Sequence, residues 1–170
     1  MTPDADDLCV FAIKRGDLET RLDTHFYLPF FQNISHIIKE KPYYRLEEIV
    51  EFSNDTTDFS EFDGEYFEYL EISGILLGLN QYKTTKTEIK KAPSRAKKKT
   101  RAGDIVVSLT RPHRGAIAII NDSEIIASTG FSVIREIKPI INKNWLLYTL
   151  LCKICLQQML QRSSGGNYPA

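Results

Sequence analysis

Cysteine is scarce in this chain, with three residues among 170. An odd and small number excludes a disulfide-stabilised scaffold and fits a reducing compartment, so we expect a cytoplasmic protein. Long apolar runs are absent too: the longest, residues 145–156, is interrupted by Thr149 and Lys153. It is shorter than the roughly 20 residues that cross a bilayer. The first ten residues carry three aspartates instead of the basic and apolar regions of a signal peptide, so we expect no export.

Signatures of catalysis and cofactor binding are also missing. No Gly-rich loop precedes a Lys-Ser or Lys-Thr pair, and no serine stands in a Gly-x-Ser-x-Gly elbow. The three histidines are isolated from one another. A metal-dependent nuclease would group acids with a lysine on a core strand, and Asp104 and Glu124 have no such neighbour at a suitable spacing. We therefore expect no catalytic activity, no metal and no cofactor in this chain.

Cys152 and Cys155 form a C-x-x-C pair, the spacing of zinc hooks and of thioredoxin-like redox sites. A redox pair begins a helix, where the helix dipole lowers the pKa of a thiol, whereas this pair falls inside a predicted buried helix. A structural zinc needs four ligands, and no second cluster matches the pair. We therefore expect a buried apolar pair.

Size and composition are those of one globular domain. The chain is 42% hydrophobic, 26% charged and 11% aromatic, which excludes collagen-like, low-complexity and wholly disordered proteins. A chain of this length is also too short for a multidomain enzyme. The sequence therefore predicts a single domain over residues 1–170.

Short apolar runs separated by turn residues dominate the second half of the chain. They are residues 105–109, 116–120, 124–127 and 131–137. Without long helical connections between them, these runs predict an antiparallel meander. Helices are expected over residues 27–40, with Pro29 in the first turn, and over residues 144–161, with Asn142 or Asn144 as the cap. Further strands are expected at 9–13 and 66–72. The fold class is therefore α+β, a twisted antiparallel sheet with flanking helices.

The net charge is zero, but the charges are segregated along the chain. Residues 1–82 hold 17 of the 22 acids and 6 of the 22 bases, and the second half holds the remainder. The basic residues are densest in the segment 83–101, which has nine bases and only Glu88. We expect an exposed loop or edge strand there that binds a polyanion; the alternative is an ordinary solvated loop. The candidate phosphate contacts are Arg95, Lys97, Lys98, Lys99 and Arg101.

A second candidate site is the tight connection 110–115, where Pro112 and Gly115 restrict the backbone between two predicted strands. A rigid loop holds its side chains in place, and the planar guanidinium of arginine matches O6 and N7 of guanine in the major groove. The candidate base-reading residues are Thr110, Arg111, His113 and Arg114. The alternative is a β-hairpin with ordinary polar side chains.

Several short segments carry a family resemblance by their order and spacing. They are Arg21-Leu22-Asp23 with Tyr27 and Pro29, Tyr69–Ile72, Pro93–Ala96, Gly103–Ile105 with Ser108, Arg111-Pro112, Ala127–Phe131 and Gly165–Pro169. In these segments the sequence resembles a target recognition domain of the DNA specificity subunit of type I restriction-modification systems. The resemblance runs nearly from end to end of the chain.

This resemblance implies a non-catalytic reader of double-stranded DNA, which recognises one half of a split target. Its implied partners are methyltransferase (modification) subunits, which bind S-adenosylmethionine, and indirectly restriction subunits. The chain stops where the family continues into a long helix and a second recognition domain, so we expect a fragment or a truncated subunit. The alternative is a protein-interaction module that docks on a methyltransferase subunit through the acidic, aromatic-rich segment 46–82 without reading DNA.

Overall fold

The structure is a computed structural model that describes residues 10–19, 21–62, 64–122 and 124–163. The chain divides into two compact units, residues 1–43 and residues 44–170. Cys9 and the segment Gly165–Pro169 lie outside the described residues. The single domain over residues 1–170 stays a prediction. Among the described residues, no helix is both long and apolar enough to cross a membrane.

The first unit contains one α-helix, α1 (Pro29–Lys39), in its described part. Pro29 occupies the first turn, as predicted, where its missing amide hydrogen costs nothing. A short 3₁₀ helix precedes it, capped by Asp23, whose carboxylate accepts the amide of Phe26 at 3.0 Å. Residues 10–13 have no regular secondary structure, so the strand predicted there is wrong; an extended segment forms a strand only when another strand pairs with it.

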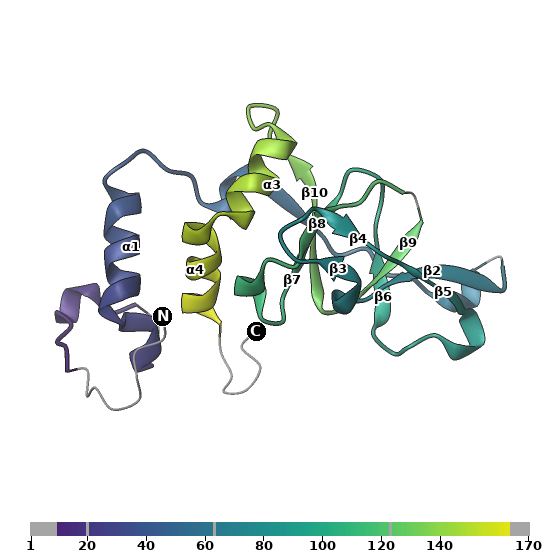
Figure 1. Cartoon of the computed structure of the whole chain (residues 1–170), viewed down its shortest axis with the longest axis horizontal. Helices are drawn as coiled ribbons and strands as arrows, with labels where there is room; N and C mark the ends of the chain where they lie inside the picture. The colour runs from purple at the N-terminus through teal and green to yellow at the C-terminus, as the bar shows by residue number, and fades with distance from the viewer. Residues whose placement is uncertain (1–9, 20, 63, 123, 164–170) are drawn as a thin grey trace. The chain divides into compact units, whose positions relative to one another are not determined.

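The second unit holds all the described strands and the remaining α-helices (Figure 1). In chain order these are α2 (Leu46–Ile49), β1 (Val50–Ser53), β2 (Tyr66–Leu70), β3 (Ile75–Leu76), β4 (Gln81–Tyr82), β5 (Thr85–Glu88), β6 (Ala96–Lys99), β7 (Ile105–Ser108), β8 (Ile117–Ile119), β9 (Ile125–Ser128), β10 (Phe131–Ile137), α3 (Lys143–Leu151) and α4 (Lys153–Arg162). The fold class is α+β, as predicted.

The strands form two four-stranded sheets and a small hairpin, not one meander. The first sheet has the order β1-β10-β7-β8 and is antiparallel throughout. The second has the order β5-β2-β9-β6, and β2 runs parallel to β9. The predicted meander is wrong because β9, which is buried along its whole length, pairs with β2 and β6 in the second sheet. The chain between the parallel strands β2 and β9 is residues 71–124. A fully apolar run does not indicate which neighbour it pairs with.

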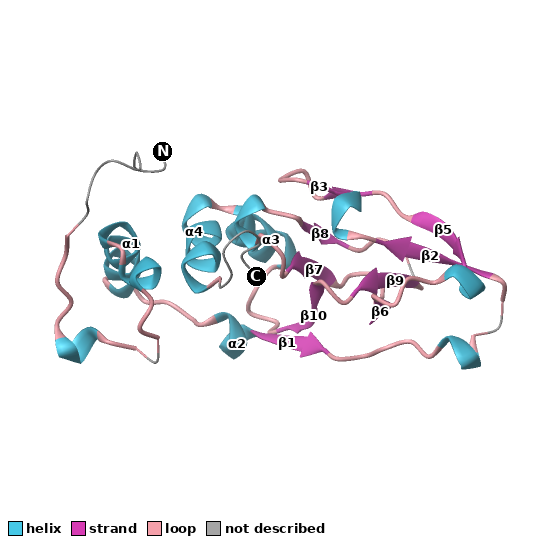
Figure 2. Ribbon diagram, turned by 90° about the horizontal axis from the view of Figure 1, so that it is seen from below, coloured by secondary structure: helices cyan, strands magenta, loops and turns pink. Residues whose placement is uncertain are grey.

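The core lies in layers on either side of the first sheet. On one face, Ile105 and Val107 of β7 pack with Leu146 and Leu150 of α3. On the other face, Val106 packs with residues of the second sheet. This alternation along one strand is what a sheet buried on both faces requires. In Figure 2, α3, the first sheet and the second sheet accordingly follow one another across the view.

The predicted helix 144–161 is broken into α3 and α4 at Cys152. Asn142, one of the two caps predicted, begins α3 by accepting the amide of Trp145 at 3.1 Å. Cys152 has extended torsions (φ −68°, ψ 150°) and becomes the N-cap of α4. It is exposed and Cys155 is half-buried, so the buried apolar pair was wrong for Cys152. Burial, followed by the influence of Cys152, raises the pKa of the Cys155 thiol to about 12, which keeps it protonated at neutral pH.

Candidate nucleic-acid interface

The connection 109–116 between β7 and β8 is a rigid loop. Pro112–Arg114 form a single 3₁₀ turn, flanked by two residues with left-handed backbone torsions, Arg111 (φ 49°) and Gly115 (φ 74°). Glycine adopts this conformation readily, whereas at Arg111 it costs of order 1 kcal/mol or more. Strain of this kind persists only where the surroundings fix the backbone, and it is common at binding sites.

Hydrogen bonds fix both ends of this loop. At its start, the Ser108 hydroxyl donates to the carbonyl of Thr110 at 2.8 Å and accepts the amide of Thr110 at 3.2 Å. At its end, the Ser108 amide donates to the carbonyl of Ala116 at 3.0 Å. α4 lies against the loop, and a Cβ at Gly115 would stand 3.5 Å from Leu151 and 3.7 Å from Leu156. The loop is thus held by both sheet and helix.

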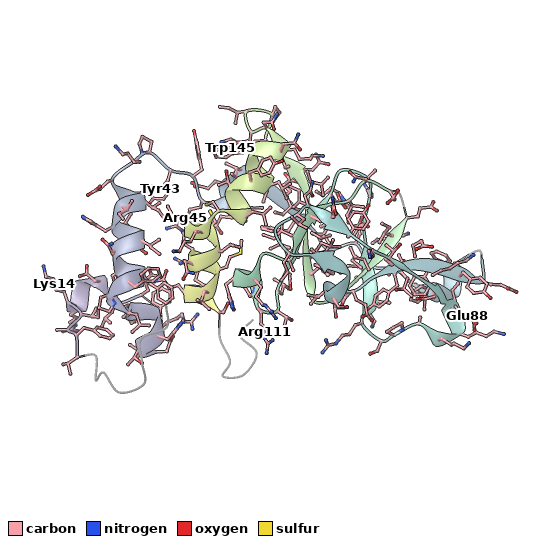
Figure 3. The ribbon with its side chains drawn as sticks, in the orientation of Figure 1. Lys14, Tyr43, Arg45, Glu88, Arg111 and Trp145 are labelled. Atoms are coloured by element: carbon pink, nitrogen blue, oxygen red, sulfur yellow. The ribbon has the colours of Figure 1, made fainter. Side chains whose placement is uncertain are left out.

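The predicted base-reading residues occupy this turn together. Arg114 is exposed, whereas Thr110, Arg111 and His113 are half-buried. Figure 3 shows Arg111 extending from the loop beside α4, away from Glu88 at the β5 end of the second sheet. The Nδ1 atom of His113 is enclosed and has no hydrogen-bond partner in the described part of the chain. The turn therefore places two guanidinium groups and an imidazole within five residues of rigid backbone.

The imidazole of His113 is held neutral by its surroundings. Burial lowers its pKa, and the positive charges of Arg114 and Arg111 lower it further. At neutral pH the ring therefore offers one N–H donor and one nitrogen acceptor, instead of a third positive charge.

Replacing Arg114 with glutamine is expected to raise the pKa of His113, because it removes the larger of the two charge effects. An NMR titration of the histidine ring protons measures this pKa directly. Arg95→Gln is the control and is expected to leave His113 unchanged. A wild-type His113 that titrates at or above the ordinary value of about 6.5 would contradict this description.

The predicted phosphate contacts lie on and beside β6, an edge strand of the second sheet. Arg95, Lys97, Lys99 and Arg101 are exposed, and Lys98 is half-buried. Part of the outer edge of β6 is hydrogen-bonded to residues 55–57. The Thr57 amide donates to the carbonyl of Lys97 at 2.8 Å, and the Lys99 amide donates to the carbonyl of Asp55 at 3.1 Å. The prediction of an exposed loop or edge strand is confirmed for β6.

One turn connects this basic strand to the loop. The Thr129 amide donates to the carbonyl of Arg95, and the Leu109 amide donates to the carbonyl of Gly130, both at 2.8 Å. Arg95 therefore lies at the loop end of β6, and the lysines follow along the strand away from the loop. The Thr129-Gly130 turn thus bonds to both segments that supply the candidate residues.

Arg101, at the far end of β6, has a different environment. Its guanidinium pairs with Asp55 at 3.1 Å, and Asp55 also pairs with Arg135. Arg135 reaches the buried Asp104 at 3.0 Å and donates to the carbonyl of Lys99 at 3.0 Å. Hydrogen bonding to Arg135 is the main cause that lowers the pKa of Asp55. Arg101 thus belongs to an ion-pair network that joins β6, β7 and β10, and its phosphate contact stays a prediction.

Most aromatic side chains of the described residues in the acidic segment 46–82 are buried or half-buried. Phe67 and Tyr69 are buried on the outer face of the second sheet, and Phe59 and Phe62 pack against them. Only Phe52 and Tyr66 are markedly exposed among the phenylalanines and tyrosines of the segment's described residues. These rings contribute to the core, which removes the main reason to regard the segment as a docking surface for a protein.

Sequence reasoning missed the groups that hold the site in place. Asp55 and Arg135 are 80 residues apart, and no local pattern marks their pairing. Asn80 was missed as well: its side-chain oxygen accepts the amide of Ile119, on the edge strand β8, at 2.8 Å. The signal available for Asn80 was the sequence Gly78-Leu-Asn80, since glycine and asparagine favour turns with positive φ. In the described part of the chain, no three His, Cys, Asp or Glu residues are grouped as metal ligands.

Comparisons with known proteins found no matching family model and no matching curated protein. Seven chains of solved structures are similar, among them the following two. One is the HsdS subunit from Thermoanaerobacter tengcongensis, with a TM-score of 0.64 and 29% identity over 78% of this chain and 37% of that subunit. The other is a chain from a study of complex assembly and conformational transition of the type I R-M system, with a TM-score of 0.64 and 29% identity over 75% of this chain and 33% of that one.

The chain has the fold of an HsdS target recognition domain. The resemblance identified from the sequence is therefore confirmed at the level of the fold. The chain spans about a third of the length of these two similar chains.

Proposed function

We propose that this recognition domain binds double-stranded DNA sequence-specifically and reads one half of a split target for a type I restriction-modification complex. The observation that supports this most is the rigid arginine loop 110–115, joined by the Thr129-Gly130 turn to the basic strand β6, in a chain with the HsdS fold. The domain itself is non-catalytic, holds no cofactor and acts in the cytoplasm. Methyl transfer and cleavage belong to its partners, the methyltransferase subunits and the restriction subunits.

The surface divides into two kinds of contact. Arg95 and the lysines of β6 attract phosphates, because flexible cations neutralise the backbone of any duplex without reading its sequence. Thr110, Arg111, His113 and Arg114 reach base edges from a fixed backbone, which is the condition for directed hydrogen bonds in the major groove. A neutral His113 adds a hydrogen-bonding ring to the loop without adding a third positive charge.

Changing Lys97, Lys98 and Lys99 together to alanine is expected to weaken binding to all duplexes similarly. The slope of log K against log salt concentration should fall by roughly one unit for each phosphate that the variant no longer neutralises. Fluorescence anisotropy with a labelled duplex of mixed sequence, titrated at several salt concentrations, measures both quantities.

The matched control changes Lys86, Lys90 and Lys91 to alanine, which removes the same charge from exposed positions at the opposite edge of the second sheet. This control is expected to keep most of the affinity and the slope. Equal losses of affinity in the two triple variants would show that only net charge matters. Wild-type binding that does not depend on salt would refute the proposed function.

A further inference from the structure

The hairpin β3–β4 presents two leucines beside the arginine loop. Its tip, residues 77–80, has left-handed torsions at Gly78 (φ 73°) and Asn80 (φ 52°). The exposed fraction is 48% for Leu77 and 61% for Leu79. Single exposed leucines are common on protein surfaces and need no explanation. Leu77 and Leu79, however, belong to a turn that hydrogen bonds hold next to the 110–115 loop.

Two hydrogen bonds attach the tip to the loop and to the first sheet. The Gly78 amide donates to the carbonyl of Gly115, the last residue of the loop, at 3.2 Å. The Asn80 side chain accepts the amide of Ile119 in β8. At the base of the hairpin, the Tyr82 hydroxyl donates to Asp122 at 2.8 Å and accepts the amide of Asn121 at 2.9 Å. The tip is therefore as firmly placed as the loop.

Within the described residues of the second unit, exposed leucine is confined to this neighbourhood. In the described part of residues 44–163, the leucines that are markedly exposed are Leu77, Leu79 and Leu109. Leu109 (47% exposed) enters the loop, and the hairpin tip bonds to its last residue. Folding gains little from leucines left in water, so a pair held in place beside arginines fits a ligand with both anionic and apolar parts.

We infer that Leu77 and Leu79 contact the C5 methyl groups of thymines in the major groove, next to the bases read from the 110–115 loop. This inference rests on the proposed function. Thymine is the base that presents an apolar group in that groove, and an apolar side chain distinguishes it from cytosine. The hairpin therefore adds an apolar element of specificity to the hydrogen-bonding element of the loop.

Replacing thymine with uracil tests this assignment, because it removes the methyl group and leaves every hydrogen-bonding atom in place. The target is first selected from a randomised duplex pool with the full chain, and each thymine is then replaced in turn. At one or two positions the wild-type chain should lose about fourfold in affinity, the equivalent of one buried methyl group. Leu77→Ala or Leu79→Ala should abolish that loss. Ile140→Ala, an exposed residue between β10 and α3, is the control and should behave as wild type.

The outcomes separate this inference from the proposed function. If the chain selects a target but uracil is neutral at every position, the leucine assignment is wrong and DNA reading stands. If uracil is neutral while the leucine variants change the bend of the DNA in a fluorescence-transfer assay, the leucines act as a wedge between bases, and the thymine assignment is again wrong. If the chain selects and binds no duplex, the proposed function fails and this inference fails with it.

Discussion

Replacing Arg135 with methionine is expected to lower the free energy of unfolding by about 3–5 kcal/mol. Arg135 is 13% exposed and Asp104 only 3%, so the change would leave a buried carboxylate without its counter-charge. The Asp104 carboxylate would keep the amide of Arg101, at 2.9 Å, but would lose both of its bonds to the Arg135 guanidinium. Urea unfolding followed by circular dichroism measures this loss.

Arg101→Met is the matched control, because it removes a guanidinium from the same network at an exposed position. Exposed ion pairs contribute little, so a loss of about 0–1 kcal/mol is expected. If both variants lost the same stability, the network would not be anchored by the buried Arg135–Asp104 pair.

Acid should weaken the same network. The folded-state pKa of Asp55 is lowered, mainly by its hydrogen bond from Arg135. A carboxylate with a lowered pKa contributes stability above its unfolded pKa of about 3.9, and this contribution is lost as the pH falls through the folded-state value. Asp55→Asn should therefore flatten the decline in stability below about pH 4.

The second large effect is expected at Arg111 and Arg114, where alanine should relax discrimination at one base position each. A bidentate contact to guanine is worth about 1–3 kcal/mol of discrimination against the wrong base. Arg111→Lys and Arg114→Lys sharpen this test, because lysine keeps the charge but lacks the planar pair of donors. Lysine at either position should preserve much of the affinity and still relax the specificity.

Arg95→Ala is the control for this comparison. Arg95 is exposed on the strand side of the Thr129-Gly130 turn, so its loss should lower affinity for all sequences alike. The clean measurement places each variant in a full specificity subunit and maps the methylated sites. If Arg111 and Arg114 variants keep the parental target and lose affinity uniformly, both residues bind phosphates and the readout lies elsewhere.

Local patterns predicted local structure well. Pro29 at the start of α1 and Asn142 at the cap of α3 each act within one turn of helix, so the sequence contains all the information that sets them. Strands β7 and β10 were located because apolar runs end at turn residues. The loop 110–115 was identified for the same reason, since Pro112 and Gly115 restrict the backbone regardless of the rest of the fold.

What the sequence left open depends on partners distant in the chain. Whether β9 pairs with β8 or with β2 is decided by how two sheets share the apolar side chains between them. No proline or glycine near Cys152 indicates the break between α3 and α4. The network at Asp55 and the contact between Gly78 and Gly115 join segments that are far apart in sequence. The two candidate segments were each selected from local sequence, but only the fold shows that the Thr129-Gly130 turn bonds to both of them.

The most direct test of DNA reading is selection from a duplex pool with a randomised central region, using the purified chain and sequencing of the bound fraction. Sequence-specific binding predicts that one short motif is enriched. The Arg111→Ala variant should lose the preference at one position of that motif. The triple variant Lys97→Ala, Lys98→Ala and Lys99→Ala should retain the motif and bind it more weakly. A bound pool with no enriched motif, or a motif unchanged by every substitution in the loop, would contradict sequence-specific reading by this domain.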